Sequence, residues 1–228
     1  MFDIIILAGG RGTRLKSVVS DVPKPMAIVN GKPFLYYLFN QVKNSHVDKT
    51  VISLGFMSEK IIDYINLENI FCKYTVEEIP LLTGGAIRLA LEETNQEDIL
   101  ILNGDTYFDL DLVAFYEFHK ENNNDISIAV KEMFNFERYG SIQIGNNNSI
   151  TAFNEKVFKK KGFINTGYIY IKNHVIKNFQ VNQPFSFEND LLNVSIDKFK
   201  MAAFIGDGTF IDIGIPEDYY LANKIFAK

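Results

Sequence analysis

The first half of the chain alternates between two hydrophobic patterns. Short, largely apolar runs at 3–7, 50–54 and 98–102 are typical of strands that a parallel sheet buries on both faces, and 73–78 is predicted as a further strand. Apolar residues at helical spacing predict helices between these runs, at 33–45, 57–67 and 84–94. Strands that alternate with helices in this way indicate an α/β fold with a mainly parallel sheet.

The pattern changes after about residue 125 and becomes a mixture of strands and helices. The predicted strands lie at 125–130, in a hairpin at 140–153, at 163–171 and near 200–213. The predicted helices lie at 111–121, 187–196 and 217–226. Because no linker rich in Pro, Gly or Ser interrupts the chain, we expect a single domain over residues 1–228, with two unlike halves at 1–124 and 125–228.

Composition narrows the classes of partner and compartment. The chain has 228 residues, of which 47% are hydrophobic, and this is enough to bury a sizeable core. A formal net charge of -5 argues against nucleic acid or a membrane surface as the main partner, although local cations still allow a small anionic ligand. The apolar run at the N-terminus is short and has no basic flank, so we expect no signal peptide and a cytoplasmic protein.

A glycine-rich loop follows the first predicted strand directly. Residues 7–15 are Leu-Ala-Gly-Gly-Arg-Gly-Thr-Arg-Leu, and Arg11, Arg14 and Lys24 add positive charge within a short stretch. Glycines let backbone N–H groups approach an anion, and ligands of α/β sheets bind at the carboxyl ends of strands. The loop lacks the Gly-Lys-Ser/Thr of a P-loop, and Leu15 stands where a dinucleotide fingerprint needs a small residue. The residues alone leave a phosphate site and a basic tight turn both open.

Carboxylates follow the strand predicted at 98–102. Asp105 comes directly after it in Asn103-Gly104-Asp105, where it is placed either to bind a hard cation or to cap a turn. Asp109-Leu110-Asp111 is a rival acidic pair, which we interpret as the cap and start of the helix at 111–121. The three histidines fall in predicted helical or surface segments, and we expect none of them to be catalytic.

The glycine loop, taken together with Pro23-Lys24-Pro25-Met26, resembles the signature of nucleotidyltransferases that activate sugar 1-phosphates. The resemblance implies the nucleotide-diphospho-sugar transferase fold, a Rossmann-like, mixed but mainly parallel sheet flanked by helices. It implies a nucleotide-binding first half and a sugar-binding second half, without the C-terminal β-helix common in the family. It also implies that the nucleotide contacts Leu7, Ala8, Gly9, Gly10, Gly12, Thr13, Arg14, Lys24, Glu78, Pro80, Thr83, Gly84, Asn103 and Asp105.

Four segments of the second half resemble the family in order. They are Arg138-Tyr139-Gly140, Phe153-Asn154-Glu155-Lys156, Asn165-Thr166-Gly167 and the segment 210–219, which carries an Asp-x-Gly-x-Pro motif. The resemblance implies that the sugar phosphate contacts Gly140, Glu155, Lys156, Asn165 and Thr166. It also implies that Asp105 and Asp212 together hold Mg²⁺.

The implied reaction joins a nucleoside monophosphate to a sugar 1-phosphate and releases pyrophosphate, with Arg14, Lys24, Asp105 and Asp212 as the catalytic residues. The short form with Leu-Thr-Gly-Gly-Ala at 82–86 most resembles guanylyltransferases of D-glycero-D-manno-heptose 1-phosphate, so GTP is the expected donor. Mannose 1-phosphate guanylyltransferases and uridylyl- or thymidylyltransferases are close alternatives. A metal-dependent glycosyltransferase and a non-catalytic nucleotide-binding module are more distant ones. The expected partners are the nucleoside triphosphate, the sugar 1-phosphate and a second copy of the chain in a homodimer.

Overall fold

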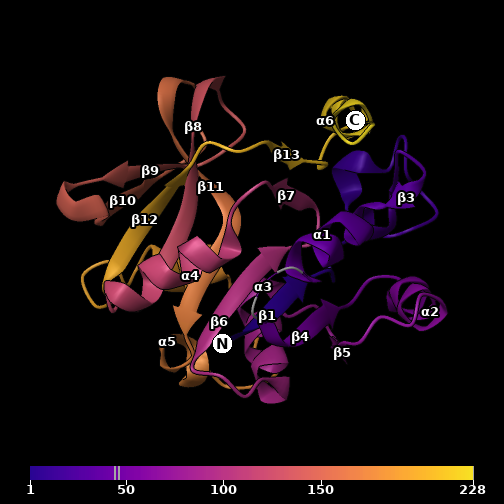
Figure 1. Ribbon diagram of the computed structural model, residues 1–228, viewed down its shortest axis with the longest axis horizontal. Helices are drawn as coiled ribbons and strands as arrows, with labels where there is room; N and C mark the ends of the chain where they lie inside the picture. Colours follow the sequence, from indigo (N-terminus) through magenta and orange to yellow (C-terminus); the bar gives the residue numbers. More distant parts are fainter. Residues whose placement is uncertain (44, 46, 228) are drawn as a thin grey trace.

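The computed structural model describes all residues except Asn44, His46 and Lys228. A sheet of nine strands forms its centre (Figure 1). These strands are β1 (Phe2–Leu7), β4 (Val47–Leu54), β5 (Lys73–Val76), β6 (Asp98–Asn103), β8 (Ile126–Phe136), β9 (Ser141–Ile144), β10 (Ile150–Asn154), β11 (Lys159–Lys172) and β12 (Met201–Gly206). Two small ribbons pair β2 (Ile28–Val29) with β3 (Lys32–Pro33), and β7 (Thr106–Phe108) with β13 (Phe210–Asp212).

The sheet joins strands from both halves of the chain. Its main path runs β10-β9-β11-β6-β1-β4-β5; β8 branches from β11 and pairs in turn with β12. β1 pairs in parallel with both β4 and β6, whereas β11 runs antiparallel to β6. The predicted mixed sheet with a parallel region is therefore confirmed, and strands before and after residue 125 share one set of backbone hydrogen bonds.

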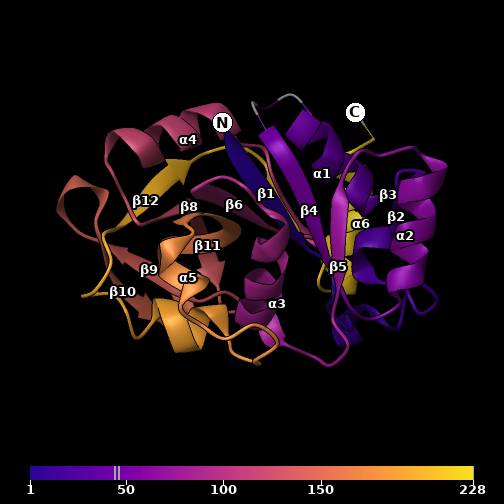
Figure 2. The same ribbon diagram turned by 90° about the horizontal axis from the view of Figure 1, so that it is seen from below.

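Helices cover both faces of this sheet. The longer ones are α1 (Phe34–Lys43), α2 (Ser58–Leu67), α3 (Leu82–Ala90), α4 (Leu112–Glu121) and α6 (Pro216–Ile225), and α5 (His174–Lys177) is a single turn. Apolar residues of α1, α2 and α4 pack on one face, and those of α3 and α5 pack on the other. Figure 2 shows this division, with α4 on one side of the sheet and α3 and α5 on the opposite side. Alternate residues of the central strands thus face two separate cores.

The parallel strands end together at one edge, which positions the site. Leu7 at the end of β1 pairs with Ser53 of β4 on one side and with Asn103 of β6 on the other. The glycine loop starts beyond Leu7, and the chain after Asn103 leads to Asp105 and β7. Because β13 pairs with β7, the ribbon brings a segment more than a hundred residues away to the same edge.

Some elements differ from those predicted. The helix expected at 187–196 is only a short wide turn, η5 (Phe187–Leu192), held by the Ser186 hydroxyl, which accepts from the Asn189 N–H at 3.1 Å. β8 and β11 extend well beyond the expected ranges because they pair with each other along most of their length. Asp111 does cap α4, since its Oδ1 accepts the N–H groups of Val113 and Ala114 at 2.9 and 3.0 Å.

Candidate active site

A cleft of about 390 Å³ opens at the carboxyl edge of the parallel strands. Its lining combines the glycine loop, the segment before α3 and the end of β6 with one residue of η5. The lining residues are Leu7, Ala8, Gly9, Gly10, Arg11, Gly12, Lys24, Pro25, Ser53, Glu77, Pro80, Leu82, Thr83, Ala86, Asn103, Asp105 and Glu188. Ten of the fourteen predicted nucleotide-binding residues lie in this set; Thr13, Arg14, Glu78 and Gly84 do not.

Close packing explains two glycines of the loop. Gly12 has a φ of 58°, and a Cβ there would lie 2.6 Å from Cγ of Lys24. A Cβ on Gly9 would lie 2.9 Å from Oε1 of Glu77. Gly10 is different, because a Cβ there would meet nothing within 4 Å, although the residue lines the cleft. Gly9 and Gly12 therefore let charged side chains approach the loop, whereas Gly10 leaves open space.

A lysine and an aspartate form the charged end of the cleft. Lys24 starts the short turn η2 (Lys24–Met26) between Pro23 and Pro25, and its side chain is 13% exposed. Its Nζ donates to Oδ2 of Asp105 at 2.7 Å. The prolines restrict the backbone on both sides of the lysine, so the ammonium group is held next to the end of β6.

Asp212 lies beside Asp105 across the β7–β13 ribbon. Asp212 pairs with Thr106, and the Ile213 N–H donates to the Asp105 carbonyl oxygen at 3.0 Å. Burial raises the pKa of the Asp212 carboxyl, and the charge of Asp105 raises it further. Asp212 does not line the cleft itself.

This pair of carboxylates fits a divalent cation. Burial is the larger cause of the raised pKa of Asp212 and the charge of Asp105 the next, and a cation between the two carboxylates would relieve their repulsion. Within the described part of the chain, no cluster of three or more His, Cys, Asp or Glu side chains is arranged to hold a metal. Two carboxylates with the remaining positions left to phosphate oxygens and water match the way Mg²⁺ is usually bound in nucleotide sites.

The second half of the chain supplies one wall of the cleft, which the sequence did not predict. Backbone N–H groups of Gly84 and Gly85 donate to the Phe185 carbonyl at 2.9 and 3.3 Å, and the Phe187 N–H donates to Oγ1 of Thr83 at 3.0 Å. These bonds hold η5 against the start of α3 and bring Glu188 into the lining. No motif marks Glu188, because only the packing of two distant segments places it there.

Gly84 is explained by this packing. A Cβ on Gly84 would lie 2.2 Å from the Phe185 ring, and its N–H is already donated to the Phe185 carbonyl. The position therefore serves the contact between α3 and the segment before η5, and the predicted contact of Gly84 with the nucleobase stays a prediction. The acidic residue of the cleft also differs from the expected one. Glu78 is exposed and lies outside the lining, whereas Glu77 lines the cleft and accepts the Leu81 N–H at 2.8 Å.

Two polar residues of the loop lie away from the cleft. Thr13 and Arg14 belong to the short turn η1 (Thr13–Leu15), are exposed and are not among the lining residues. Arg11 lines the cleft in their place. The turn buries Leu15 instead, and this anchors η1 with its two polar side chains toward the solvent.

The predicted sugar-site segments meet around one residue of β9. Ser141 pairs with Asn154 on β10 and with Ile164 on β11, so Gly140, Glu155 and Asn165 are sequence neighbours of three paired residues. Glu155 and Lys156 are exposed at the end of β10. None of the five predicted sugar-phosphate residues lines the cleft.

A bulge in β11 shapes the side of this region that faces the cleft. The Gly167 N–H donates to Oδ1 of Asn165 at 2.9 Å, and a Cβ on Gly167, whose φ is 78°, would lie 2.3 Å from Nδ2 of Asn103. The bulge thus connects the sugar segment to a residue of the cleft. Thr166 has a buried side chain whose hydroxyl donates to the Ala129 carbonyl at 2.7 Å, and its predicted contact with the sugar phosphate stays a prediction.

Arg138 links the sugar region to the paired carboxylates. Its Nη2 lies 2.6 Å from Oδ2 of Asp218 in α6 and 3.8 Å from Oδ2 of Asp212. Gly140 follows two residues later at the start of the β9–β10 hairpin. Asp212 therefore lies next to the segment that carries Asp105 and next to Arg138, which precedes the predicted sugar-site residue Gly140.

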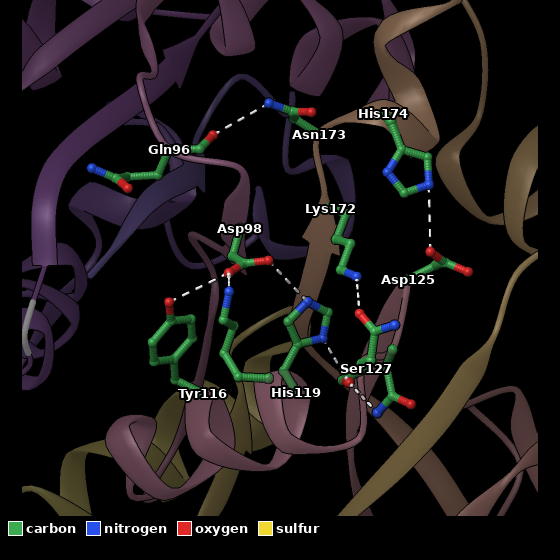
Figure 3. A network of polar contacts seen from close by, with 12 residues as sticks. Gln96, Asp98, Tyr116, His119, Asp125, Ser127, Lys172, Asn173 and His174 are labelled. Atoms are coloured by element: carbon green, nitrogen blue, oxygen red, sulfur yellow. Dashed lines mark hydrogen bonds and ion pairs between the residues drawn. The ribbon is translucent and has the colours of Figure 1, made fainter.

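A separate polar network lies at the opposite end of β6 (Figure 3). Asp98, which is 3% exposed, lies 3.1 Å from Nζ of Lys120 and 3.6 Å from Nε2 of His119, and the Tyr116 hydroxyl donates to it at 3.3 Å. Nδ1 of His119 lies 2.8 Å from the Ser127 hydroxyl. His119 and His174 both belong to this end of the sheet, far from the glycine loop, and His46 lies outside the described residues. Because its contacts join β6, α4 and β8 at the end of β6 opposite the cleft, this network stabilises the fold.

Comparison with known proteins shows which family the chain resembles. The family model for nucleotidyl transferase matches residues 3–228. The chain is 42% identical to D-glycero-alpha-D-manno-heptose 1-phosphate guanylyltransferase of Campylobacter jejuni, over 95% of this chain and 96% of that protein. The protein of the same name from Aneurinibacillus thermoaerophilus is also 42% identical, over 97% of both chains. Among solved structures, HddC from Yersinia pseudotuberculosis complexed with GMP-PN aligns with a TM-score of 0.88 and 38% identity, over 99% of this chain and 100% of that one.

Proposed function

The chain belongs to the nucleotidyl transferase family, and we propose that it transfers GMP from GTP to D-glycero-α-D-manno-heptose 1-phosphate and releases pyrophosphate. The resemblance predicted from the glycine loop and the Pro23-Lys24-Pro25 segment is thereby confirmed. The observation that carries the proposal is the cleft, where the glycine loop, the Lys24 ammonium and the Asp105 carboxylate meet. Two relatives of matching length bear the proposed activity in their names, and HddC was solved with GMP-PN.

The chemistry needs charge neutralisation more than proton transfer. An oxygen of the sugar phosphate, already ionised at neutral pH, attacks the α-phosphorus of GTP; a P–O bond forms there as the bond to pyrophosphate breaks. The glycine loop offers backbone N–H groups, and Arg11 and Lys24 offer positive charge at the cleft. These groups oppose the repulsion between two polyanions and stabilise the departing pyrophosphate. Arg14 is exposed on η1, and its predicted role stays a prediction.

We assign Asp105 and Asp212 as the residues that would hold Mg²⁺. Both are acceptor-only carboxylates at the end of β6 and on the adjoining ribbon, and their like charges favour a shared cation. When bound, the ion would neutralise phosphate charge next to the reacting group. Arg138 contacts Asp212 and Asp218, and so restrains the orientation of the second carboxylate.

Guanine readout is assigned to the carboxylates of the cleft. Guanine presents N–H donors at N1 and N2, and a carboxylate accepts from both, whereas adenine has no donor at those positions. Glu188 is exposed in the cleft wall, and its carboxylate has no hydrogen-bond or ion-pair partner among the described residues. Glu77 is already engaged by the Leu81 N–H, so Glu188 is the better candidate for the base edge.

The sugar 1-phosphate is assigned to the region around Ser141. Glu155 and Lys156 are exposed there and carry the charges suited to sugar hydroxyls and to a phosphate, and Asn165 lies on the adjoining strand. Because Arg138 joins this region to Asp212, a sugar phosphate bound there would lie near the second carboxylate. Thr166 is left out of this assignment because its side chain is buried.

The proposal is tested by release of pyrophosphate from GTP, ATP, CTP, UTP and dTTP, each with heptose, mannose and glucose 1-phosphates, with and without a chelator. We expect GTP with the heptose phosphate to give the highest kcat/KM, and the chelator to abolish it. Turnover with UTP or dTTP, or with mannose 1-phosphate above heptose 1-phosphate, would assign a different member of the family. Sugar transfer from a nucleotide sugar without pyrophosphate release would instead indicate a glycosyltransferase.

The assembly state and the cellular location of the protein are proposals of their own. In the residues that the structure describes, no helix is both long and apolar enough to span a bilayer. We propose a cytoplasmic enzyme whose partners are the two substrates and a second copy of the chain. Sedimentation of the purified protein tests the proposed homodimer.

A further inference from the structure

One leucine at the cleft adopts a backbone conformation that leucine normally avoids. Nine non-glycine residues of the described chain have positive φ, and seven of them are asparagines. The other two are Met57, with a φ of 55°, and Leu82, with a φ of 60°. Asparagine tolerates this region because its short polar side chain bonds locally, whereas leucine has no such compensation. Leu82 lines the cleft and Met57 does not.

Contacts on both sides impose this conformation on Leu82. The preceding residue, Leu81, is buried and donates its N–H to Oε2 of Glu77 at 2.8 Å. Its carbonyl accepts the Phe185 N–H at 3.1 Å, and the Gly84 N–H donates to the Phe185 carbonyl at 2.9 Å. Backbone held at Leu81 and Gly84 leaves little freedom between them, so the strain persists in the folded state.

Glycine would adopt this positive φ without strain, so the presence of leucine at position 82 must be explained by its side chain. The side chain is not used in the core, because Leu82 is 58% exposed. It stands in the cleft wall together with Pro80 and Ala86, at α3 rather than at the Lys24–Asp105 end. A strained residue that exposes an apolar side chain in a ligand cleft indicates that this side chain packs against the ligand when the ligand binds.

The chemistry of a nucleobase fits this wall. A base has polar edges and apolar faces, and Glu188 in the same lining supplies an acceptor for an edge. An exposed aliphatic side chain removes apolar area from water when a flat ring lies on it. A purine covers more of such a side chain than a pyrimidine does, because it has two fused rings.

We propose that Leu82 is a specificity-determining residue, whose side chain forms the apolar surface on which the face of the nucleobase lies. The conformational strain at residue 82 is retained because this contact favours the larger base. The inference deepens the proposed function and rests on it in so far as the bound base is guanine.

The test compares Leu82→Gly with Met57→Gly in the full-length protein. Both changes relieve a positive-φ strain, but only Leu82 lines the cleft. Thermal unfolding and direct calorimetric binding of GTP and UTP are measured for each variant. For Leu82→Gly we expect a melting temperature equal to or above that of the wild type, and GTP affinity weakened about tenfold, the low end of what a missing aliphatic contact costs a pocket. UTP affinity should fall less, and Met57→Gly should leave both affinities unchanged.

Several results would overturn the inference. If Leu82→Gly binds GTP with wild-type affinity, the proposed contact does not exist. If its affinity for UTP falls as much as its affinity for GTP, Leu82 does not determine specificity. A melting temperature clearly below the wild type would show that the side chain serves the fold. Binding does not depend on turnover, so failure of the inference can be distinguished from failure of the proposed function, which fails when the wild type releases no pyrophosphate from GTP and heptose 1-phosphate.

Discussion

Gly84→Ala tests whether the close approach of α3 to the second half of the chain builds the nucleotide cleft. The added Cβ would lie 2.2 Å from Cε2 and 2.3 Å from Cδ2 of Phe185. A normal carbon–carbon contact is about 3.5 Å, so the ring has to move by about 1.3 Å. Phe185 has little room for this, because it is 6% exposed and stacks on Phe179 with ring centroids 4.2 Å apart.

The expected cost follows from these contacts. Overpacking of a rigid core costs about 1–3 kcal/mol, and this geometry belongs in the upper part of that range. Alanine regains up to about 1 kcal/mol of helix propensity over glycine in α3. We therefore expect a net loss of about 2 kcal/mol, which corresponds to a fall in melting temperature of about 4–8 °C for a domain of this size. The KM for GTP should rise as well, because the shift of Phe185 also displaces Glu188.

Gly10→Ala is the matched control. A Cβ there meets nothing within 4 Å, yet Gly10 lines the cleft. Its melting temperature should stay at or slightly above that of the wild type, while the KM for GTP rises because the methyl group restricts the ligand. Thermal unfolding and initial-rate kinetics on the two variants check both quantities. If Gly84→Ala melts within about 1 °C of the wild type, the reasoning from the Phe185 contact is refuted.

Three further predictions concern individual charged side chains. Lys24→Ala and Asp105→Ala should each lower kcat by about 10²–10³-fold without unfolding the protein. Pyrophosphate release measures kcat and circular dichroism measures folding, with Lys16→Ala, outside the cleft, as the control. Near wild-type turnover in either variant would contradict the assignment. Glu188→Gln should raise the KM for GTP about tenfold with little effect on that for ATP, and an equal change for both nucleotides would exclude base readout. Burial would raise the pKa of Asp98, but the contacts of its carboxylate with His119 and Lys120 outweigh burial, and the pKa is lowered. The ionised carboxylate therefore stabilises the fold at pH values above its ordinary pKa, and this contribution is lost as the pH falls from the ordinary pKa through the lowered one. Urea unfolding between about pH 2 and 5 should show a steeper loss of stability in the wild type than in Asp98→Asn, and identical slopes would contradict this prediction.

Much of the fold follows from short-range patterns along the chain. The runs at 3–7 and 98–102 are apolar after their first residue, an aspartate in each, because both faces of β1 and β6 are buried. Such runs are visible in a sequence. The glycine loop and Pro23-Lys24-Pro25 are contiguous as well, so the position of the cleft at the end of β1 was predictable. Asp111 at the start of α4 is a cap of the same local kind.

Side chains that depend on contacts between distant segments were beyond such patterns. Glu188 reaches the cleft only because backbone hydrogen bonds join Phe185 and Phe187 to the start of α3, about a hundred residues earlier in the chain. The choice between Glu77 and Glu78 depends on which neighbour turns inward as β5 ends, and Thr166 turns inward to the Ala129 carbonyl at a bulge. Local chemistry indicates which residue types suit a site of this kind, whereas the packing of α3, η5 and β11 decides which residues of those types reach the cleft.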